Sequence, residues 1–117
     1  MNSKEEFLGI VEEFKQNKII VIVEGKKDAA ALRQFGLNNI LELSKKPLFA
    51  VVEEVSDNYK ECAILTDLDK KGKELYGKLN RDLSQRGIKI NDKLRNFLYR
   101  NTKIRQIEGL RDESLMQ

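Results

Sequence analysis

Residues 19–28 read Ile-Ile-Val-Ile-Val-Glu-Gly-Lys-Lys-Asp, and they give the clearest indication of the fold. Five β-branched residues in a row, Ile19 to Val23, are too few for a helix and too continuous for a strand with one face in water. They predict a central parallel strand buried on both faces. The strand stops at Glu24-Gly25, and the residues that follow, Ala29-Ala30-Ala31-Leu32, favour a helix. A carboxylate thus stands at the C-terminal end of the strand, where open parallel sheets bind ligands.

The length and composition predict one domain that spans residues 1–117. We expect a core over about 18–110, an N-terminal helix over about 4–16 and a C-terminal tail over about 111–117. The beginning of the chain is polar and acidic, unlike a signal peptide, and the longest apolar run is far too short to span a membrane. The single cysteine, Cys62, excludes an internal disulfide. These features predict a cytoplasmic protein without a membrane partner.

The sequence contains no histidine and only one cysteine. Histidine general bases and zinc sites built from histidine or several thiolates are therefore excluded. A metal in this protein must be held by oxygen ligands, which suit magnesium, manganese or calcium.

The net charge of +3 conceals two segments of opposite sign. Residues 1–69 contain 9 Lys/Arg and 13 Asp/Glu, whereas residues 70–111 contain 13 Lys/Arg and 4 Asp/Glu. An acidic first part and a basic second part suit a protein that holds a cation beside a polyanion.

Hydrophobic periodicity predicts an α/β fold in which strands and helices alternate. Strands are expected over about 19–23, 40–43, 62–66 and 104–107, and helices over about 4–16, 27–35, 47–55, 70–86 and 92–98. Residues 88–90 fit either a small strand or a turn. The pattern predicts a parallel sheet of about four strands with helices on both faces.

Acidic residues follow two of these strands. Glu24 ends the first strand, and Asp67 and Asp69 follow the strand over 62–66. The ends of parallel strands meet at one edge of a sheet, and carboxylates gathered there repel one another unless a divalent cation lies between them. Gly72, just inside the next helix, leaves room for a phosphate near the helix N-terminus. An acidic loop on the surface without a ligand is the alternative explanation.

The two motifs together resemble the Toprim domain. The first is Glu24-Gly25-Lys26-Lys27-Asp28 after a hydrophobic strand, and the second is Thr66-Asp67-Leu68-Asp69-Lys70-Lys71-Gly72 after another. This Rossmann-like domain occurs in topoisomerases, bacterial-type primases, OLD-family nucleases, RecR-type repair proteins and the ribonuclease that matures small ribosomal RNA. The resemblance covers roughly residues 18–110, and the length is similar to that of small stand-alone Toprim proteins, closest in style to the ribosomal RNA maturation nuclease.

The resemblance implies roles for the motif residues. Glu24 would act as general acid/base, and Asp67 and Asp69 would coordinate Mg²⁺, with Glu24 completing the metal set and Mn²⁺ as an alternative ion. Either Lys26 or Lys27 would meet a phosphate at the catalytic site. Gly25 and Gly72 would allow the backbone to approach the ligand closely. The chain has no room for the tyrosine domain of topoisomerases or for the additional parts of primases.

Basic residues in the second part of the chain predict a nucleic-acid surface. The residues concerned are Lys70, Lys71, Lys73, Arg100, Lys103 and Arg105. Charged helix faces are often only solvated, but the charge imbalance beside a predicted phosphate site favours contact with an RNA or DNA backbone. Aromatic residues are too few in this region to argue for base stacking.

The sequence thus predicts a magnesium-dependent enzyme that processes nucleic-acid phosphodiesters, most simply a nuclease or its catalytic module. The main alternative is a non-catalytic Toprim module that binds nucleic acid, or a protein partner in a processing complex, during RNA processing or DNA repair. A receiver domain or aspartyl phosphatase is disfavoured, because Lys70 follows the D-x-D where a phosphatase requires Thr or Val.

Overall fold

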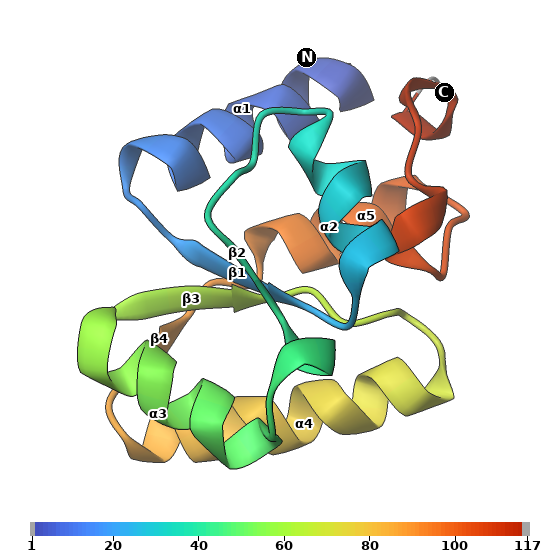
Figure 1. Ribbon diagram of the computed structural model, residues 1–117. Coiled ribbons are helices and arrows are strands. Elements are labelled where there is room, and N and C mark those ends of the chain that lie inside the picture. The colour runs from blue at the N-terminus through green and yellow to red at the C-terminus, as the bar shows by residue number, and fades with distance from the viewer. Residues whose placement is uncertain (1, 116–117) are drawn as a thin grey trace.

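A computed structural model describes residues 2–115 of the chain (Figure 1). Four parallel strands form one sheet in the order β2-β1-β3-β4. The strands are β1 (Ile20–Val23), β2 (Ile40–Glu42), β3 (Glu61–Ile64) and β4 (Lys89–Ile90). The α-helices are α1 (Ser3–Gln16), α2 (Lys26–Arg33), α3 (Leu48–Asn58), α4 (Lys70–Gln85) and α5 (Lys93–Asn101). Short 3₁₀ helices are η1 (Leu43–Lys45), η2 (Ile107–Gly109) and η3 (Asp112–Leu115).

The predicted α/β class, the parallel sheet and the helices on both faces are confirmed. The predicted strand over 104–107 is wrong, because this segment is irregular and leads into η2. Its backbone bonds to a neighbouring loop instead of a strand, since the Ile107 amide donates to the Asp67 side chain. The fourth strand is β4, from the stretch over 88–90 that the sequence left open.

Alternating residues of the central strands fill two separate cores. Val21, Val23 and Ala63 face α1, α2 and α5, whereas Ile20 and Ile22 face α3 and α4. Figure 1 shows the same three layers, with α1, α2 and α5 above the sheet and α3 and α4 below it. β1 is therefore buried on both faces, as its unbroken run of β-branched residues predicts. Among residues 2–115, no helix is long and apolar enough to cross a membrane.

Cys62 belongs to this interior and has no chemical role that the structure supports. The residue is fully buried in β3, and its thiol is free. Burial raises the pKa of the thiol to about 12, so it stays protonated and unreactive at neutral pH. It acts as a small apolar core residue.

The strand order reverses between β1 and β3, and this reversal is a topological switch point. β1 leads through α2 to β2 on one side, whereas β3 leads through α4 to β4 on the other. The chain thus leaves the two adjacent strands in opposite directions, on opposite faces of the sheet (Figure 1). Ligands of open α/β sheets bind at such a switch point, outside the C-terminal ends of the strands. Glu24 follows β1 at this point, and the segment with Asp67 and Asp69 follows β3.

The core on the α1 side depends on Phe7, which is fully buried. Its ring lies 4.9 Å from that of Phe35 and 5.9 Å from that of Phe97. We expect Phe7→Ala to lower the free energy of unfolding by about 3–5 kcal/mol, because it removes apolar contacts and leaves a cavity. Urea denaturation measures this change. Leu8→Ala, at a neighbouring site that is 43% exposed, should change it by no more than about 0.5 kcal/mol; similar losses for both variants would contradict the prediction.

Candidate active site at the β1–β3 switch point

A hydrogen bond from loop to loop joins the two central strands at their C-terminal ends. The Glu24 carboxylate accepts, through Oε2, the backbone amide of Asp67 at 2.8 Å. The two residues are 43 positions apart in the chain, and they meet because β1 and β3 are hydrogen-bonded neighbours. The predicted convergence of the two motifs on one edge of the sheet is thus seen directly in the backbone geometry.

The Asp67 side chain fixes the segment that leads into η2. Its Oδ1 accepts the amide of Ile107 at 2.8 Å. A second bond joins the same two segments, because the Leu68 amide donates to the carbonyl of Arg105 at 2.6 Å. The C-terminal part of the chain is therefore held against the D-x-D loop, beside the switch point.

Asp69 begins α4. It is the N-cap residue, and its Oδ1 accepts the amide of Gly72 at 2.8 Å. The buried Thr66 hydroxyl donates to the carbonyl of the same glycine at 2.7 Å. A Cβ atom on Gly72 would lie 1.9 Å from the carbonyl oxygen of Asp67, so no larger residue fits without a backbone shift. Gly72 thus allows the first turn of α4 to pack directly on the loop that carries both aspartates.

Arg95 supports this loop from the α5 side. Its Nη1 donates to the carbonyl of Thr66 at 2.6 Å, and its Nη2 donates to the carbonyl of Asp67 at 3.2 Å. The guanidinium also lies over the Tyr76 ring, 4.6 Å from its centroid. Burial lowers the pKa of Arg95, and the negative charges around it, including those of Glu24 and Asp67, act in the opposite direction. No sequence pattern pointed to this residue, because one arginine among many on a basic helix gives no signal.

Two further carboxylates lie around the site. Asp28 is 7% exposed, and its Oδ2 accepts the amide of Gly25 at 3.0 Å. Burial raises the pKa of Asp28, the Gly25 amide lowers it, and the charges of Asp67, Glu24 and Glu108 raise it further. This hydrogen bond caps the N-terminus of α2, and the spacing of Glu24-Gly25-x-x-Asp28 in the sequence is typical of such a cap. Glu108 comes near only because η2 packs against α2, which the sequence did not reveal.

The acids are not gathered into a preformed metal cluster. Within residues 2–115, no group of three or more carboxylate, histidine or cysteine side chains lies close enough to hold a metal ion. Glu24, Asp67 and Asp69 each give one oxygen to a backbone amide. Each carboxylate has a second oxygen, and Mg²⁺ needs only one or two carboxylates beside water and substrate phosphate. The donor set therefore fits Mg²⁺, and its binding by these residues stays a prediction.

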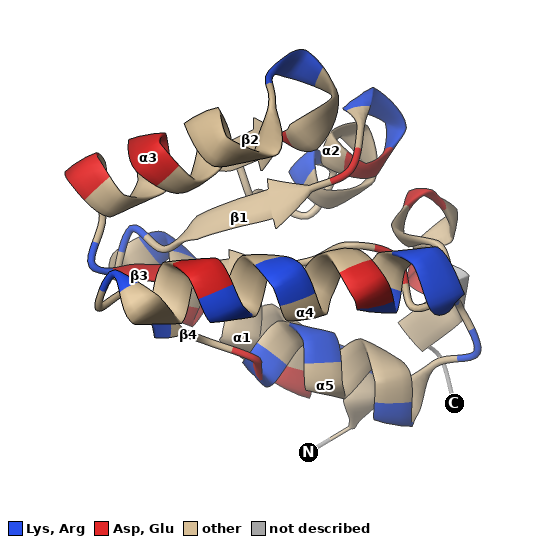
Figure 2. Cartoon of the chain, turned by 90° about the horizontal axis from the view of Figure 1, so that it is seen from below, with Lys and Arg blue, Asp and Glu red and all other residues tan. Residues whose placement is uncertain are grey.

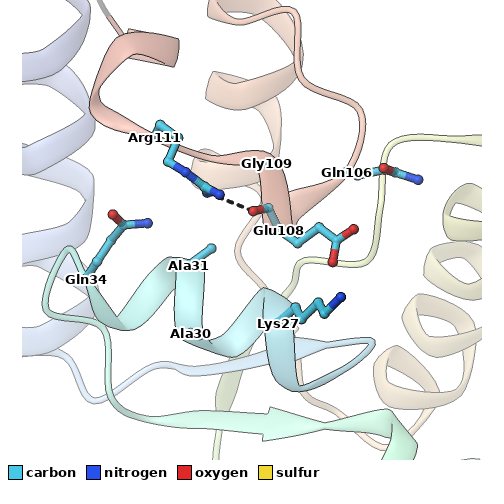
Figure 3. A pocket seen from close by; sticks show the side chains of 8 residues that line it. All are labelled: Lys27, Ala30, Ala31, Gln34, Gln106, Glu108, Gly109 and Arg111. Atoms are coloured by element: carbon cyan, nitrogen blue, oxygen red, sulfur yellow. Dashed lines mark hydrogen bonds between the residues drawn. The ribbon is translucent and has the colours of Figure 1, made fainter.

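The two lysines that were predicted to contact a phosphate differ in their surroundings. Both Lys26 and Lys27 are exposed in the first turn of α2. Lys27 lines an open cavity of about 670 Å³ between α2 and η2, together with Gln106, Glu108 and Arg111 (Figure 3). In this cavity Arg111 donates to the carbonyl of Glu108 at 2.9 Å. None of the three acids of the switch point lines the cavity, so it lies beside the site and is not the site itself.

Gly25 precedes α2 in an extended conformation that other residues also adopt, with φ −153° and ψ −173°. A Cβ atom there would have open space around it. The fold itself therefore does not require glycine at this position, and its predicted role in admitting a ligand stays a prediction.

The predicted nucleic-acid residues are all exposed, and they come from α4, α5 and the segment that follows α5. Figure 2 shows basic residues along both α4 and α5, which lie on opposite faces of the sheet. The predicted residues are Lys70, Lys71, Lys73, Arg100, Lys103 and Arg105. Two of them meet over one aromatic ring, since Lys73 Nζ lies 5.5 Å and the Arg105 guanidinium 5.1 Å from the centroid of Tyr99.

The fold and the acids at the switch point define the class of protein. The model of the Toprim domain family matches residues 19–111, which include both acidic motifs, η2 and all four strands of the sheet. The chain belongs to the Toprim domain family. Toprim domains in general take part in metal-dependent processing of nucleic acids.

The relatives narrow this to a family of small proteins. The UPF0292 protein MJ1624 of Methanocaldococcus jannaschii is 36% identical over 112 residues, which cover 91% of this chain and 88% of that protein. The UPF0292 protein PYRAB04740 of Pyrococcus abyssi is 38% identical over 107 residues, covering 91% and 80%. The chain is thus a member of the UPF0292 family. A solved structure, a putative protein from Aquifex aeolicus, has a TM-score of 0.81 at 29% identity and covers 91% of this chain and 96% of that one.

Gly72 gives a direct test of the loop geometry. We expect Gly72→Ala to lower the free energy of unfolding by about 1–3 kcal/mol, because the new methyl group overlaps the carbonyl oxygen of Asp67. Gly77→Ala is the matched control in the same helix, where a Cβ meets nothing within 4 Å; it should raise stability by about 0.5–1 kcal/mol. Equal effects in chemical denaturation would show that the contact at Gly72 is not tight.

Asp28 predicts a pH dependence of stability. Because its pKa is raised in the folded protein, the folded state retains a proton that the unfolded state has lost above the usual value of 3.8. Stability from this group therefore falls as pH rises through that window. We expect the unfolding free energy of Asp28→Asn, relative to wild type, to increase from about pH 4 to about pH 7. The asparagine side chain can still accept the Gly25 amide, and the exposed Asp57→Asn controls for the lost charge; a constant difference would contradict the prediction.

Proposed function

We propose that this protein processes nucleic-acid phosphodiesters with the help of magnesium, as a nuclease or as the catalytic module of one. The observation that carries the proposal is the position of three carboxylates, Glu24, Asp67 and Asp69, at the β1–β3 switch point. Backbone amides hold one oxygen of each carboxylate. The second oxygens can act on a ligand without any change in the hydrogen bonds that hold the loops. Membership of the Toprim family supports the same chemistry.

The three acids divide into two roles. Asp67 and Asp69 would hold Mg²⁺, or Mn²⁺ in its place, through the oxygens that are not bonded to Ile107 and Gly72. A bound divalent ion stabilises negative charge on the phosphate and positions the attacking and leaving oxygens. Glu24 would move the proton through Oε1, because its Oε2 is engaged by the Asp67 amide. Arg95 fixes the carbonyls of the loop, so that both aspartates keep their positions during the reaction.

The surroundings of the acids favour a polyanionic substrate. Lys26 and Lys27 extend from the N-terminal turn of α2, where backbone amides and the helix dipole also favour phosphate. On the other side of the switch point, α4 begins with Lys70-Lys71-Gly72-Lys73 directly after the D-x-D. Positive charge thus flanks the acids on both sides, and it can bind the phosphates next to the one that reacts.

A second candidate is a non-catalytic module that binds nucleic acid or a protein of a processing complex. The observation that favours it is that the described acids form no preformed metal cluster, and that each already has a structural hydrogen bond. In this case the acids would serve to hold the loops, and the basic surface would carry the function.

Conservative substitutions distinguish the two candidates. With Mg²⁺ and labelled mixed-sequence RNA and DNA oligonucleotides, wild type should yield cleavage products, and chelation of the metal should abolish them. Glu24→Gln should slow cleavage by about 10²–10⁴-fold through the loss of proton transfer. Asp67→Asn should lose both cleavage and the rise in melting temperature that Mg²⁺ produces in wild type. Each variant keeps the acceptor atom for its backbone amide, so the fold should be retained.

Glu74→Gln is the matched control, because Glu74 is an exposed acid in the next turn of α4. It should cleave as wild type does. If wild type binds the oligonucleotides without cleaving them, and Mg²⁺ changes neither its stability nor that of Asp67→Asn, the binding module is the better description.

A further inference from the structure

Three residues from three separate segments form a cluster beside the acids. Lys73 lies in the first turns of α4, Tyr99 in α5 and Arg105 in the irregular segment before η2. Both cations lie over the Tyr99 ring, with Lys73 Nζ at 5.5 Å and the Arg105 guanidinium at 5.1 Å from its centroid. We call these three residues the Tyr99 platform. Only the tertiary fold brings them together, since they span 33 positions of the chain.

The platform is anchored to the D-x-D loop from two sides. The Lys73 amide donates to the carbonyl of Asp69 at 2.9 Å, and the carbonyl of Arg105 accepts the amide of Leu68 at 2.6 Å. Leu68 stands between the two aspartates. The platform therefore keeps a fixed position relative to the acids, and whatever binds on it lies next to the proposed reaction site.

The Tyr99 ring remains accessible at this place. Its residue is 50% exposed, and among residues 2–115 it belongs with Leu8 and Phe49 to the large hydrophobic residues that are exposed. Leu8 lies on α1 and Phe49 on α3. Tyr99 is thus an exposed aromatic ring that lies beside the acids and carries two cations, an arrangement typical of surfaces that stack nucleic-acid bases.

We propose that the Tyr99 platform binds an unpaired nucleotide of a single-stranded substrate, next to the phosphodiester that the acids process. This inference rests on the proposed function, because it places the platform within the same site. A base would stack on the ring face that the flexible Lys73 side chain leaves, while Lys73 turns to the adjoining phosphate. The planar guanidinium of Arg105 stays stacked on the ring and holds it in place. In a duplex, paired bases stack on one another and cannot reach the ring.

Binding of the strand, measured without chemistry, tests the platform. Fluorescence anisotropy with a labelled mixed-sequence oligonucleotide, as RNA and as DNA, and with the matching blunt duplex is recorded in a chelator, so that no cleavage occurs. Tyr99→Leu should weaken single-strand binding by roughly 5- to 150-fold, the range of one lost base stack. Duplex binding should change less than about twofold. Tyr99→Phe keeps the ring and should bind as wild type does.

The Lys73 side chain gives an independent readout. In Lys73→Ala, the slope of log binding constant against log salt should become shallower by about 0.7, because one phosphate contact with a single strand is lost. Tyr99→Leu should leave this slope unchanged. Phe49→Leu removes an aromatic ring that is 68% exposed on α3, and it should leave all binding unchanged. Thermal unfolding of each variant excludes loss of the fold.

Three results would overturn the inference: no single-strand binding by wild type, equal binding by wild type and Tyr99→Leu, or an equal loss on single strand and duplex. A protein ligand would then be the better partner for this surface. The proposed function fails separately. Cleavage by wild type with normal single-strand binding by Tyr99→Leu would leave the enzyme and remove the platform. Strand binding through Tyr99 without any magnesium-dependent cleavage would leave the platform and remove the enzyme.

Discussion

The hydrogen bond from the Asp67 amide to the Glu24 carboxylate is the interaction on which the site depends. It joins the loops that leave β1 and β3 in opposite directions, beyond the end of the paired strands. Asp67 also links the segment before η2 to these two loops, because its side chain accepts the Ile107 amide. Acidic side chains therefore have a structural task here, and their position would be specified even before a ligand binds. One oxygen of each carboxylate accepts a backbone amide, and the other oxygen can contact a ligand.

Carboxylates at one edge of a sheet repel one another, and Arg95 supplies part of the compensating positive charge. Its guanidinium is half-buried beneath the D-x-D loop and donates to the carbonyls of Thr66 and Asp67. Burial lowers the pKa of the arginine and disfavours its charge, whereas the nearby acids and the Tyr76 ring favour the charged form. Arg95 thus offsets part of the negative charge of Glu24 and Asp67 at this edge of the sheet.

Local sequence signals were sufficient for most of the fold. An unbroken β-branched run of this length favours a strand buried on two faces, so β1 was evident from residues 19–23. The predicted strand over 104–107 was wrong; Ile104 and Ile107 flank polar residues, and a short strand has the same pattern. The backbone of this segment bonds to Asp67 and Leu68, partners that are distant in sequence. Arg95 and Glu108 were missed, and base stacking at Tyr99 was not argued, for the same reason: the neighbours of these residues are set by tertiary packing, which no local pattern contains.

The acidic and basic segments, which are separate in the sequence, lie next to each other in the folded protein. If they lay on opposite faces, the protein would only have a dipole. Instead α4 begins after Asp69 with three lysines in its first four residues, and the segment with Arg105 returns to bond Leu68. The sign of the charge thus changes within one helical turn of the acids. A cation and a polyanion can be held side by side only at such a boundary, and the β1–β3 switch point provides it.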